Sequence, residues 1–253
     1  MNKVIKTANR VLISTMLLSC PLLASAEQSK EVLFNGTFSG SLEMATDYVF
    51  RGESETGDGD IPAIKGSFTW THEDGVYAGV FGATNKFEST PDIRAVLAPY
   101  IGKFGTFGDS DISYNVFVFH YTYPGVEDMD YTDLWMKVAK DFGPVKLELE
   151  VTPTLNDWFG VEGWSGVNYA VHPSKTFDNG IQLSGSIGYQ ELSGEGAEGW
   201  THWNLGLSKN VYGLNVDVRY HDSDVDSSHK VYGSEQGQKI FDERFVFSVS
   251  KNF

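Results

Sequence analysis

Cysteine is almost absent from this chain of 253 residues, in which Cys20 is the single example. That residue lies in a segment with the features of a secretory signal peptide: Lys3, Lys6 and Arg10, an apolar run over 11–23, and the small-residue site Ala24-Ser-Ala26. Removal of residues 1–26 would leave residues 27–253 without disulfides or thiolate chemistry. Acylation of Cys20 is the alternative, but the bulky Leu18 and the downstream Ala-Ser-Ala site argue against it.

Long apolar runs and basic residues are also scarce. Beyond residue 26 no stretch approaches the roughly 18 apolar residues of a membrane helix, so the mature chain can cross a bilayer only as a closed barrel. Without the three basic residues of the leader, 16 Lys and Arg stand against 34 Asp and Glu, a formal charge of −18. This excess argues against nucleic acid and anionic membrane surfaces as partners.

What the mature chain does have is alternation of apolar and polar residues, the period of a strand with two different faces. Clear runs cover 38–45, 64–70, 76–83, 134–138, 145–152, 167–171, 181–189, 203–207, 214–220 and 244–252. Two further segments are less regular. Residues 93–102 contain Pro99, and 112–121 are apolar on both faces near Phe117 and Phe119, which indicates either a bulge or a lumen filled by aromatic side chains. The count is about twelve strands, an even number typical of bacterial outer-membrane barrels.

The connections alternate as such a barrel requires. The long or acidic ones are 52–62, 85–92, 124–130, 155–165, 191–199 and 222–243, and those between them are mostly shorter. Short turns on the periplasmic side and longer outer loops are the rule in this class of barrel. The sequence therefore predicts an all-β fold: a single antiparallel transmembrane β-barrel of about twelve strands, in the bacterial outer membrane.

The last strand fits this prediction. Phe245, Phe247 and Val249 share one face, and the chain stops at Phe253. A C-terminal alternating strand that ends in an aromatic residue is typical of outer-membrane barrels, so we expect these four residues to act as the signal for the barrel-assembly machinery. The ordinary alternative is an edge strand of a soluble β-protein.

A distinctive motif follows the first strand, at Thr46-Asp-Tyr-Val-Phe-Arg-Gly-Glu-Ser54. It resembles the motif that closes the first strand in the TorF family of proteobacterial outer-membrane proteins, and 121–125 and 130–133 are also similar to that family, with Asp133 in place of the usual Glu. The resemblance covers most of the mature chain and implies a porin architecture without a known solute. The family motif comprises Asp47, Tyr48, Phe50, Arg51 and Gly52.

The phase of the strand before this motif gives its residues positions. If the phase continues, Tyr48 and Phe50 face lipid near the outer interface, whereas Asp47 and Arg51 face the lumen. Arg51 would then lie at the pore mouth, or would form a bracing ion pair with Asp47. Other aromatic residues near predicted strand ends are expected to be interfacial anchors, namely Trp70, Tyr123, Trp200 and Trp203. A carbohydrate channel would also need aromatic residues of this kind.

The same phase predicts the charged residues that line the pore. These residues are Glu43, Asp47, Arg51, Lys65, Asp133, Lys137, Lys146, Glu148, Glu150, Asp217 and Arg219. Their positive and negative charges are nearly balanced, so the excess negative charge of the chain must reside in the loops. Such a lumen is either a narrow wet channel or is plugged by salt bridges across it.

Catalysis and metal binding have weaker signals. Histidines at 120, 172, 202 and 221 lie on or near strands, but no nucleophile-elbow spacing accompanies them, so we expect no enzyme. Asp222-Ser-Asp-Val-Asp226 has the first spacing of a calcium loop but lacks its Gly and Glu, which rejects an EF-hand and leaves weak divalent-cation binding as an option. No cofactor or metal site is predicted.

The sequence thus predicts a channel for passive diffusion of small hydrophilic solutes, with acidic outer loops that favour cations. A plugged barrel that serves as a structural or adhesive surface protein is the main alternative, and a barrel hydrolase is the next. The expected partners are outer-membrane lipid, the barrel-assembly machinery and the solutes; the oligomeric state stays open.

Overall fold

The computed structural model describes residues 35–87, 90, 92–126 and 128–253. In this part of the chain, twelve strands close into an antiparallel barrel, which confirms the predicted fold. The first strand, β1 (Gly36–Ala45), pairs with the last, β14 (Arg244–Asn252), and closes the ring. Between them lie β4 (Ala63–His72), β5 (Val76–Thr84), β6 (Ala95–Thr106), β7 (Ile112–Tyr121), β8 (Tyr131–Asp141), β9 (Lys146–Pro153), β10 (Ser165–Thr176), β11 (Ile181–Ser193), β12 (Trp200–Val211) and β13 (Leu214–Ser223). The predicted signal peptide, residues 1–26, lies outside the described residues.

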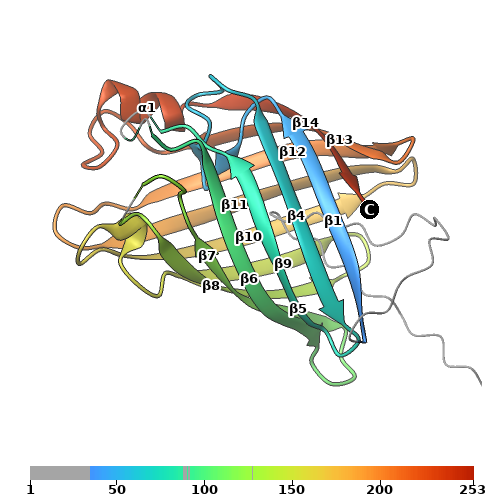
Figure 1. Ribbon diagram of the computed structural model, residues 1–253. Helices are drawn as coiled ribbons and strands as arrows, with labels where there is room; N and C mark the ends of the chain where they lie inside the picture. The colour runs from blue at the N-terminus through green and yellow to red at the C-terminus, as the bar shows by residue number, and fades with distance from the viewer. Residues whose placement is uncertain (1–34, 88–89, 91, 127) are drawn as a thin grey trace, which may run out of the picture.

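The connections alternate in length, as predicted. The short ones are 73–75, 107–111, 142–145, 177–180 and 212–213; the long ones are 46–62, 85–94, 122–130, 154–164, 194–199 and 224–243. Both helices of the described residues, η1 (Trp158–Gly160) and α1 (Glu235–Phe241), belong to long connections. Figure 1 shows α1 at the opposite end of the barrel from the C-terminus. We call the end with the long connections the outer end and the other the inner end.

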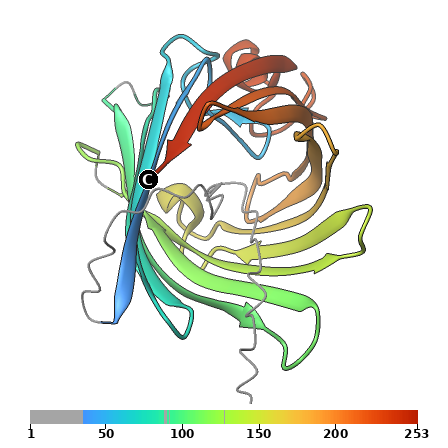
Figure 2. The same ribbon diagram turned by 90° about the vertical axis from the view of Figure 1, so that its right-hand side faces the viewer.

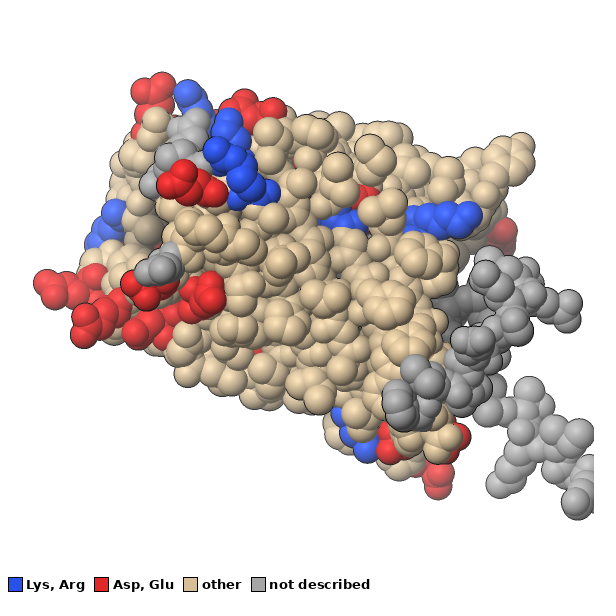
Figure 3. Space-filling model, in the orientation of Figure 1, with Lys and Arg blue, Asp and Glu red and all other residues tan. Residues whose placement is uncertain are grey.

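The outward face of the barrel is an apolar belt. Leu42, Leu205 and Phe247 are 50%, 58% and 47% exposed, and many other large apolar side chains share this face. On the side of the molecule in Figure 3, charged side chains gather toward the two ends, and the surface between them is mostly uncharged. Such a large exposed apolar surface is stable against lipid and would promote aggregation in water. None of the described helices is long and apolar enough to cross a membrane.

The inside of the barrel is divided into two halves. From β5 to β8 the inward side chains are mainly aromatic and form a buried slab: Tyr77, Phe81, Tyr100, Phe117, Phe119, Tyr121, Tyr131 and Trp135. Tyr100 stacks on Phe119 with 5.7 Å between ring centroids, and Phe117 stacks on Trp135 at 5.5 Å. The pairing of β7 with β8 runs without interruption from Ile112 to Tyr121. An aromatic lumen, and not a bulge, therefore explains why 112–121 is apolar on both faces.

The slab also explains two glycines. A Cβ at Gly79 would collide with the Tyr100 ring, and one at Gly102 would collide with Phe117 and Tyr77. Pro99, the residue that made 93–102 ambiguous, lies on the outward face of β6 opposite Val80. A cavity lies beside the slab, and most of the residues that line it come from the other half of the ring, from β9 to β14 and on to β1 and β4.

Candidate functional site

The chain folds into the barrel directly after β1. Here β2 (Val49–Phe50) and β3 (Glu53–Ser54) form a two-stranded sheet separate from the barrel, and Figure 2 shows this light-blue segment inside the ring of strands. Arg51 and Gly52 form its two-residue turn with φ values of 51° and 88°, the left-handed pair that a type I′ hairpin requires. We call residues 47–56 the inward hairpin.

Asp47 holds the base of the inward hairpin. Its carboxylate accepts hydrogen bonds from the hydroxyls of Ser54 and Thr56, and it forms an ion pair with Arg244 at 2.8 Å. Asp47 is 5% exposed, and Ser54 and Thr56 are fully buried. Because a buried carboxylate is costly unless it is bonded and paired, these contacts favour the folded-in position of the hairpin.

Arg51 at the tip crosses the lumen. Its guanidinium donates to Asp133 on β8 at 3.2 Å and to Gln190 on β11 at 3.0 Å. The indole N–H of Trp200 on β12 donates to the Arg51 carbonyl at 2.8 Å. The guanidinium carbon also lies 4.6 Å from the centroid of Phe50, a cation–π distance. One residue from the first connection therefore joins three strands on the far wall.

The expected positions of Tyr48 and Phe50 on the lipid face are wrong. Tyr48 is 4% exposed and packs edge-on against Phe81, and Phe50 lies 6.2 Å from both Tyr121 and Trp135 between ring centroids. The strand phase does not continue because β1 ends at Ala45 and the chain then turns inward. An Asp47–Arg51 ion pair is also not observed, since the two residues pair with Arg244 and Asp133 instead.

Burial perturbs two acids of this hairpin. Glu53 is 8% exposed, and burial raises its pKa to about 8. Burial also raises the pKa of Glu55, helped by the charge of nearby Glu53 and opposed by a hydrogen bond from Asn85. Both carboxyl groups therefore retain protons at a higher pH here than they would in water.

An aromatic cap from the outer loops lies beside the hairpin. Trp200 is 2% exposed, and its ring centroid lies 5.3 Å from that of Phe241 in α1 and 6.1 Å from that of Trp158 in η1. Tyr123 is 3% exposed. The expected interfacial positions of Trp200 and Tyr123 are therefore wrong, whereas Trp70 and Trp203 do belong to the outward face of their strands.

The remaining lumen is a cavity of about 280 Å³. The inward hairpin and the slab contribute Tyr48, Phe50, Phe81 and Trp135 to its wall, and the other half of the barrel contributes seven serines and five side-chain amides. Nine of the eleven charged residues predicted to line the pore contact this cavity: Glu43, Asp47, Arg51, Lys65, Lys146, Glu148, Glu150, Asp217 and Arg219. Asp133 and Lys137 face the interior, but they are buried beneath Arg51 and the β9 glutamates and do not contact the cavity.

The charged residues of the interior are paired with one another. Lys65 lies 2.7 Å from Glu43, and Lys137 lies 3.2 Å from Glu148 and 2.9 Å from Glu150. Within the described residues, the barrel interior and the inward hairpin hold six acids and six bases besides Glu53 and Glu55, whose burial favours the protonated, uncharged form. The twelve are Glu43, Asp47, Asp133, Glu148, Glu150 and Asp217 with Arg51, Lys65, Lys137, Lys146, Arg219 and Arg244. The interior is therefore formally neutral, and the negative charge of the chain lies elsewhere.

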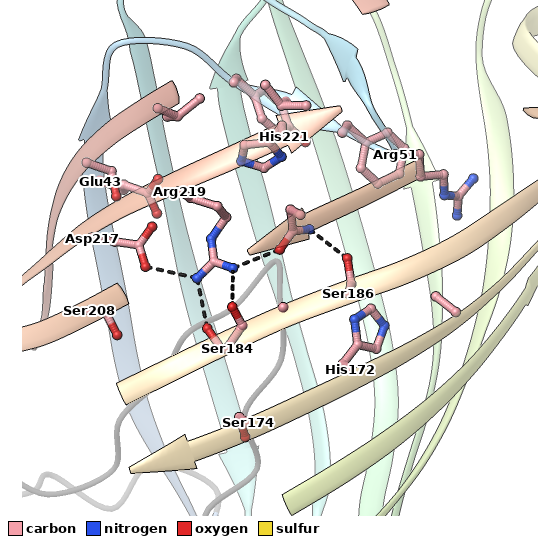
Figure 4. Close-up of a pocket in the computed structure, with 18 of the residues that line it drawn as sticks. Glu43, Arg51, His172, Ser174, Ser184, Ser186, Ser208, Asp217, Arg219 and His221 are labelled. Carbon is pink, nitrogen blue, oxygen red and sulfur yellow. Dashed lines mark hydrogen bonds and ion pairs between the residues drawn. The ribbon is translucent and has the colours of Figure 1, made fainter. Parts of the chain in front are cut away.

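Arg219 is a charged residue of the cavity wall whose guanidinium is bonded to other groups of the same wall (Figure 4). Its side chain lies across β12 at Gly206, where a Cβ would be 2.8 Å from the guanidinium carbon. One terminal nitrogen donates to the Ser184 carbonyl and to Asn204, and the other donates to the Ser184 hydroxyl and to Asp217 at 2.9 Å. Both terminal nitrogens thus bond the wall itself.

Three of the histidines that the sequence singled out bond different partners, and His120 lies 2.9 Å from the hydroxyl of Thr132. His172 bonds Glu150 and His202 bonds Asn168, and in the part of the chain that the structure describes no histidine ring bonds a serine hydroxyl. No group of three or more potential metal ligands is found among the described residues. In the calcium-like segment, Asp224 accepts from the Thr201 amide and Asp226 from Ser228, so these carboxylates bind separate protein groups.

Comparison with known proteins places the chain in a family and relates its fold to porins. The model of the Gcw_chp family, described as a bacterial protein of unknown function, matches residues 32–253. Among solved structures, the KdgM porin is similar with a TM-score of 0.56 and 9% identity, over 85% of this chain and 99% of that chain. The NanC porin in a rhombohedral crystal form is similar with a TM-score of 0.53 and 8% identity, over 85% of this chain and 98% of that chain. At such identities the likeness concerns the fold alone.

A search of curated proteins finds no match. The family match covers almost all of the chain after the predicted signal peptide. This chain belongs to the Gcw_chp family, bacterial proteins of unknown function.

Proposed function

We propose that this protein is an outer-membrane porin through which small hydrophilic solutes diffuse. The observation that carries the proposal is the combination of an apolar belt outside the barrel with a cavity inside it that serines, amides and charged side chains line on one side. A barrel of eight strands is filled by its own side chains, and one of sixteen leaves an open channel. Twelve strands with one aromatic half leave a cavity along the polar half, which suits small solutes.

The charge distribution supports a cation preference at the outer entrance only. The interior is formally neutral, whereas the long connections carry many exposed acids, among them Asp58, Asp60, Asp226 and Asp242. Acidic residues around an entrance raise the local concentration of cations and lower that of anions, and salt screens this effect. We therefore expect a weak, salt-dependent cation preference that comes from the loops.

A second candidate function rests on the inward hairpin. Because residues 47–56 and the aromatic cap occupy the outer end of the lumen, we infer that they obstruct the barrel there in this conformation. A permanently closed barrel would be a structural or adhesive surface protein. The two candidates differ in one property, which is whether the hairpin can leave its position.

The motif similarity to the TorF family of porins supports a channel, and we propose that Asp47, Tyr48, Phe50, Arg51 and Gly52 specify the inward hairpin in such proteins. Delivery to the membrane would use the predicted signal peptide of residues 1–26. Phe245, Phe247 and Val249, on the outward face of β14, and Phe253 would form the signal that the barrel-assembly machinery reads.

Conductance of residues 27–253, refolded into a planar bilayer, tests the proposal. Folding is checked first by heat-dependent mobility on a gel. Discrete conductance steps support a channel, and the reversal potential in a salt gradient measures its ion preference. Folded protein that conducts in neither the wild-type form nor a variant with a released hairpin refutes the porin and favours the surface protein.

A further inference from the structure

The hydrogen bonds of the side chains that line the lumen indicate which class of solute the channel carries. We propose that the cavity selects neutral, hydroxyl-rich solutes of about monosaccharide size over charged solutes of the same size. This inference rests on the proposed channel function and specifies what the channel carries.

The first argument is that the charged groups of the wall are already bound. Arg219 is bonded to Asp217, Asn204 and Ser184, as described above, and Glu43 is paired with Lys65 at 2.7 Å. An anionic solute would have to take Arg219 away from these partners, and a cationic one would have to take Glu43 from Lys65. A charged solute in the lumen would therefore lose water without gaining a free counter-charge.

The second argument is the hydrogen-bonding capacity that remains. Ser208, Asp217 and Ser248 pair directly across β12, β13 and β14, which places a row of polar groups around this wall. Among the described residues, the hydroxyls of Ser208, Ser248 and Ser250 have no protein partner in the structure, and each can both donate and accept. Such groups match solute hydroxyls, which also donate and accept.

The third argument is the opposite wall. The rings of Tyr48, Phe50, Phe81 and Trp135 contact the same cavity. A sugar has a hydroxyl edge and a C–H face, so it can bond the serine wall and pack on the aromatic one. The cavity volume of about 280 Å³ is near the lower end of the range for small-molecule pockets, roughly 300–1,000 Å³.

The test compares three solutes of one size in proteoliposome swelling: a neutral hexose, a hexuronate and a hexosamine. Conductance of the same preparation is recorded in parallel. We expect the hexose to enter fastest. If the preparation conducts ions but the hexuronate or the hexosamine enters as fast as the hexose, the inference is wrong and the channel stands. If the preparation shows neither conductance nor entry of any solute, even with the inward hairpin released, both are wrong.

Two variants free Arg219 by different means. Asp217→Asn removes the counter-charge of Arg219, and Gly206→Ala displaces the guanidinium toward the lumen without changing any charge. Both should raise hexuronate entry relative to hexose by about tenfold, a size typical of electrostatic focusing in a cleft. Leu205→Val, a neutral change on the outward face of the strand that carries Gly206, is the matched control and should leave all entry ratios unaltered, since Leu205 is 58% exposed and does not line the cavity. Unchanged ratios in both variants would show that Arg219 does not set selectivity.

Discussion

Replacing Arg51 with alanine should release the inward hairpin. The guanidinium and Asp133 have side-chain exposures of 6% and 0%, so the pair is dry, and the substitution leaves the Asp133 carboxylate with only the Thr154 hydroxyl as a partner. Removal of one member of a buried pair costs about 3–5 kcal/mol. If that energy is lost from the closed conformation, the ratio of open to closed barrels rises by roughly two to nearly four powers of ten.

Single-channel recording measures this change directly. The wild-type chain should be mostly closed, and R51A should be open for a much larger fraction of the time or should conduct in larger steps. D133N alone removes the charge on the other side of the pair, and R51A/D133N removes both. The double variant should be closer to wild type than R51A if the uncompensated carboxylate is the cause.

A matched control comes from an exposed pair. Lys140→Ala removes a salt bridge to Asp111 whose side chains are 38% and 64% exposed, and it should leave conductance unchanged. Two results would refute the reasoning. One is R51A conducting like wild type although the protein is folded, and the other is R51A that no longer folds into a barrel while D133N does.

Three further predictions concern the hairpin and its surroundings. Burial raises the pKa of Glu53 to about 8, above the value of about 4.3 in water, so the closed state binds the proton of Glu53 more tightly and loses stability as pH rises between these values. The open probability should therefore increase from pH 6 to pH 9, and E53Q should reduce this increase. An equal increase in E53Q and wild type would refute the prediction. Gly52→Ala places a Cβ 3.0 Å from that of His202 at a φ of 88° and should destabilise the closed state by about 1 kcal/mol, seen as a modest gain in open probability that is smaller than for R51A. Phe241→Ala removes a ring that is 1% exposed from the aromatic cap, which should cost about 3–5 kcal/mol of local stability. The loop at 224–243 should become sensitive to added protease, while the barrel keeps its heat-dependent gel mobility. Protease resistance equal to that of wild type would contradict this prediction.

The barrel strands were predictable because lipid imposes a simple rule on them. Every spanning residue that faces outward must be apolar, so runs such as 145–152 and 244–252 show their two faces in the sequence alone. The same reasoning placed Glu43, Lys65, Asp217 and Arg219 on the inner face. The alternation of short and long connections was also predicted from the sequence.

The inward hairpin was not predictable from that rule. Tyr48 and Phe50 are aromatic, and aromatic residues suit the membrane interface as well as they suit an aromatic slab inside the barrel. The partners of Arg51 are 82 and 139 residues away along the chain, at Asp133 and Gln190, and no local pattern marks them. The one usable local signal was the dipeptide Arg51-Gly52 between apolar Val49-Phe50 and polar Glu53-Ser54, an arrangement that permits a hairpin with a two-residue turn.

The division of the lumen gives the motif a physical meaning. An aromatic slab along β5–β8 needs a partner surface on its open side, and Phe50 supplies it at the tip of the hairpin, beside Tyr121 and Trp135. Arg51 then reaches past the slab to Asp133, and Asp47 ties the base of the hairpin to Arg244 on β14, the strand that closes the ring by pairing with β1. Asp47 and Arg51 are thus each matched to a counter-charge on the barrel wall. Besides the aromatic packing of Tyr48 and Phe50, two ion pairs hold the hairpin, so changes at a few residues can weaken its position. The chemistry of the motif therefore favours a channel that opens over a barrel that is closed for good.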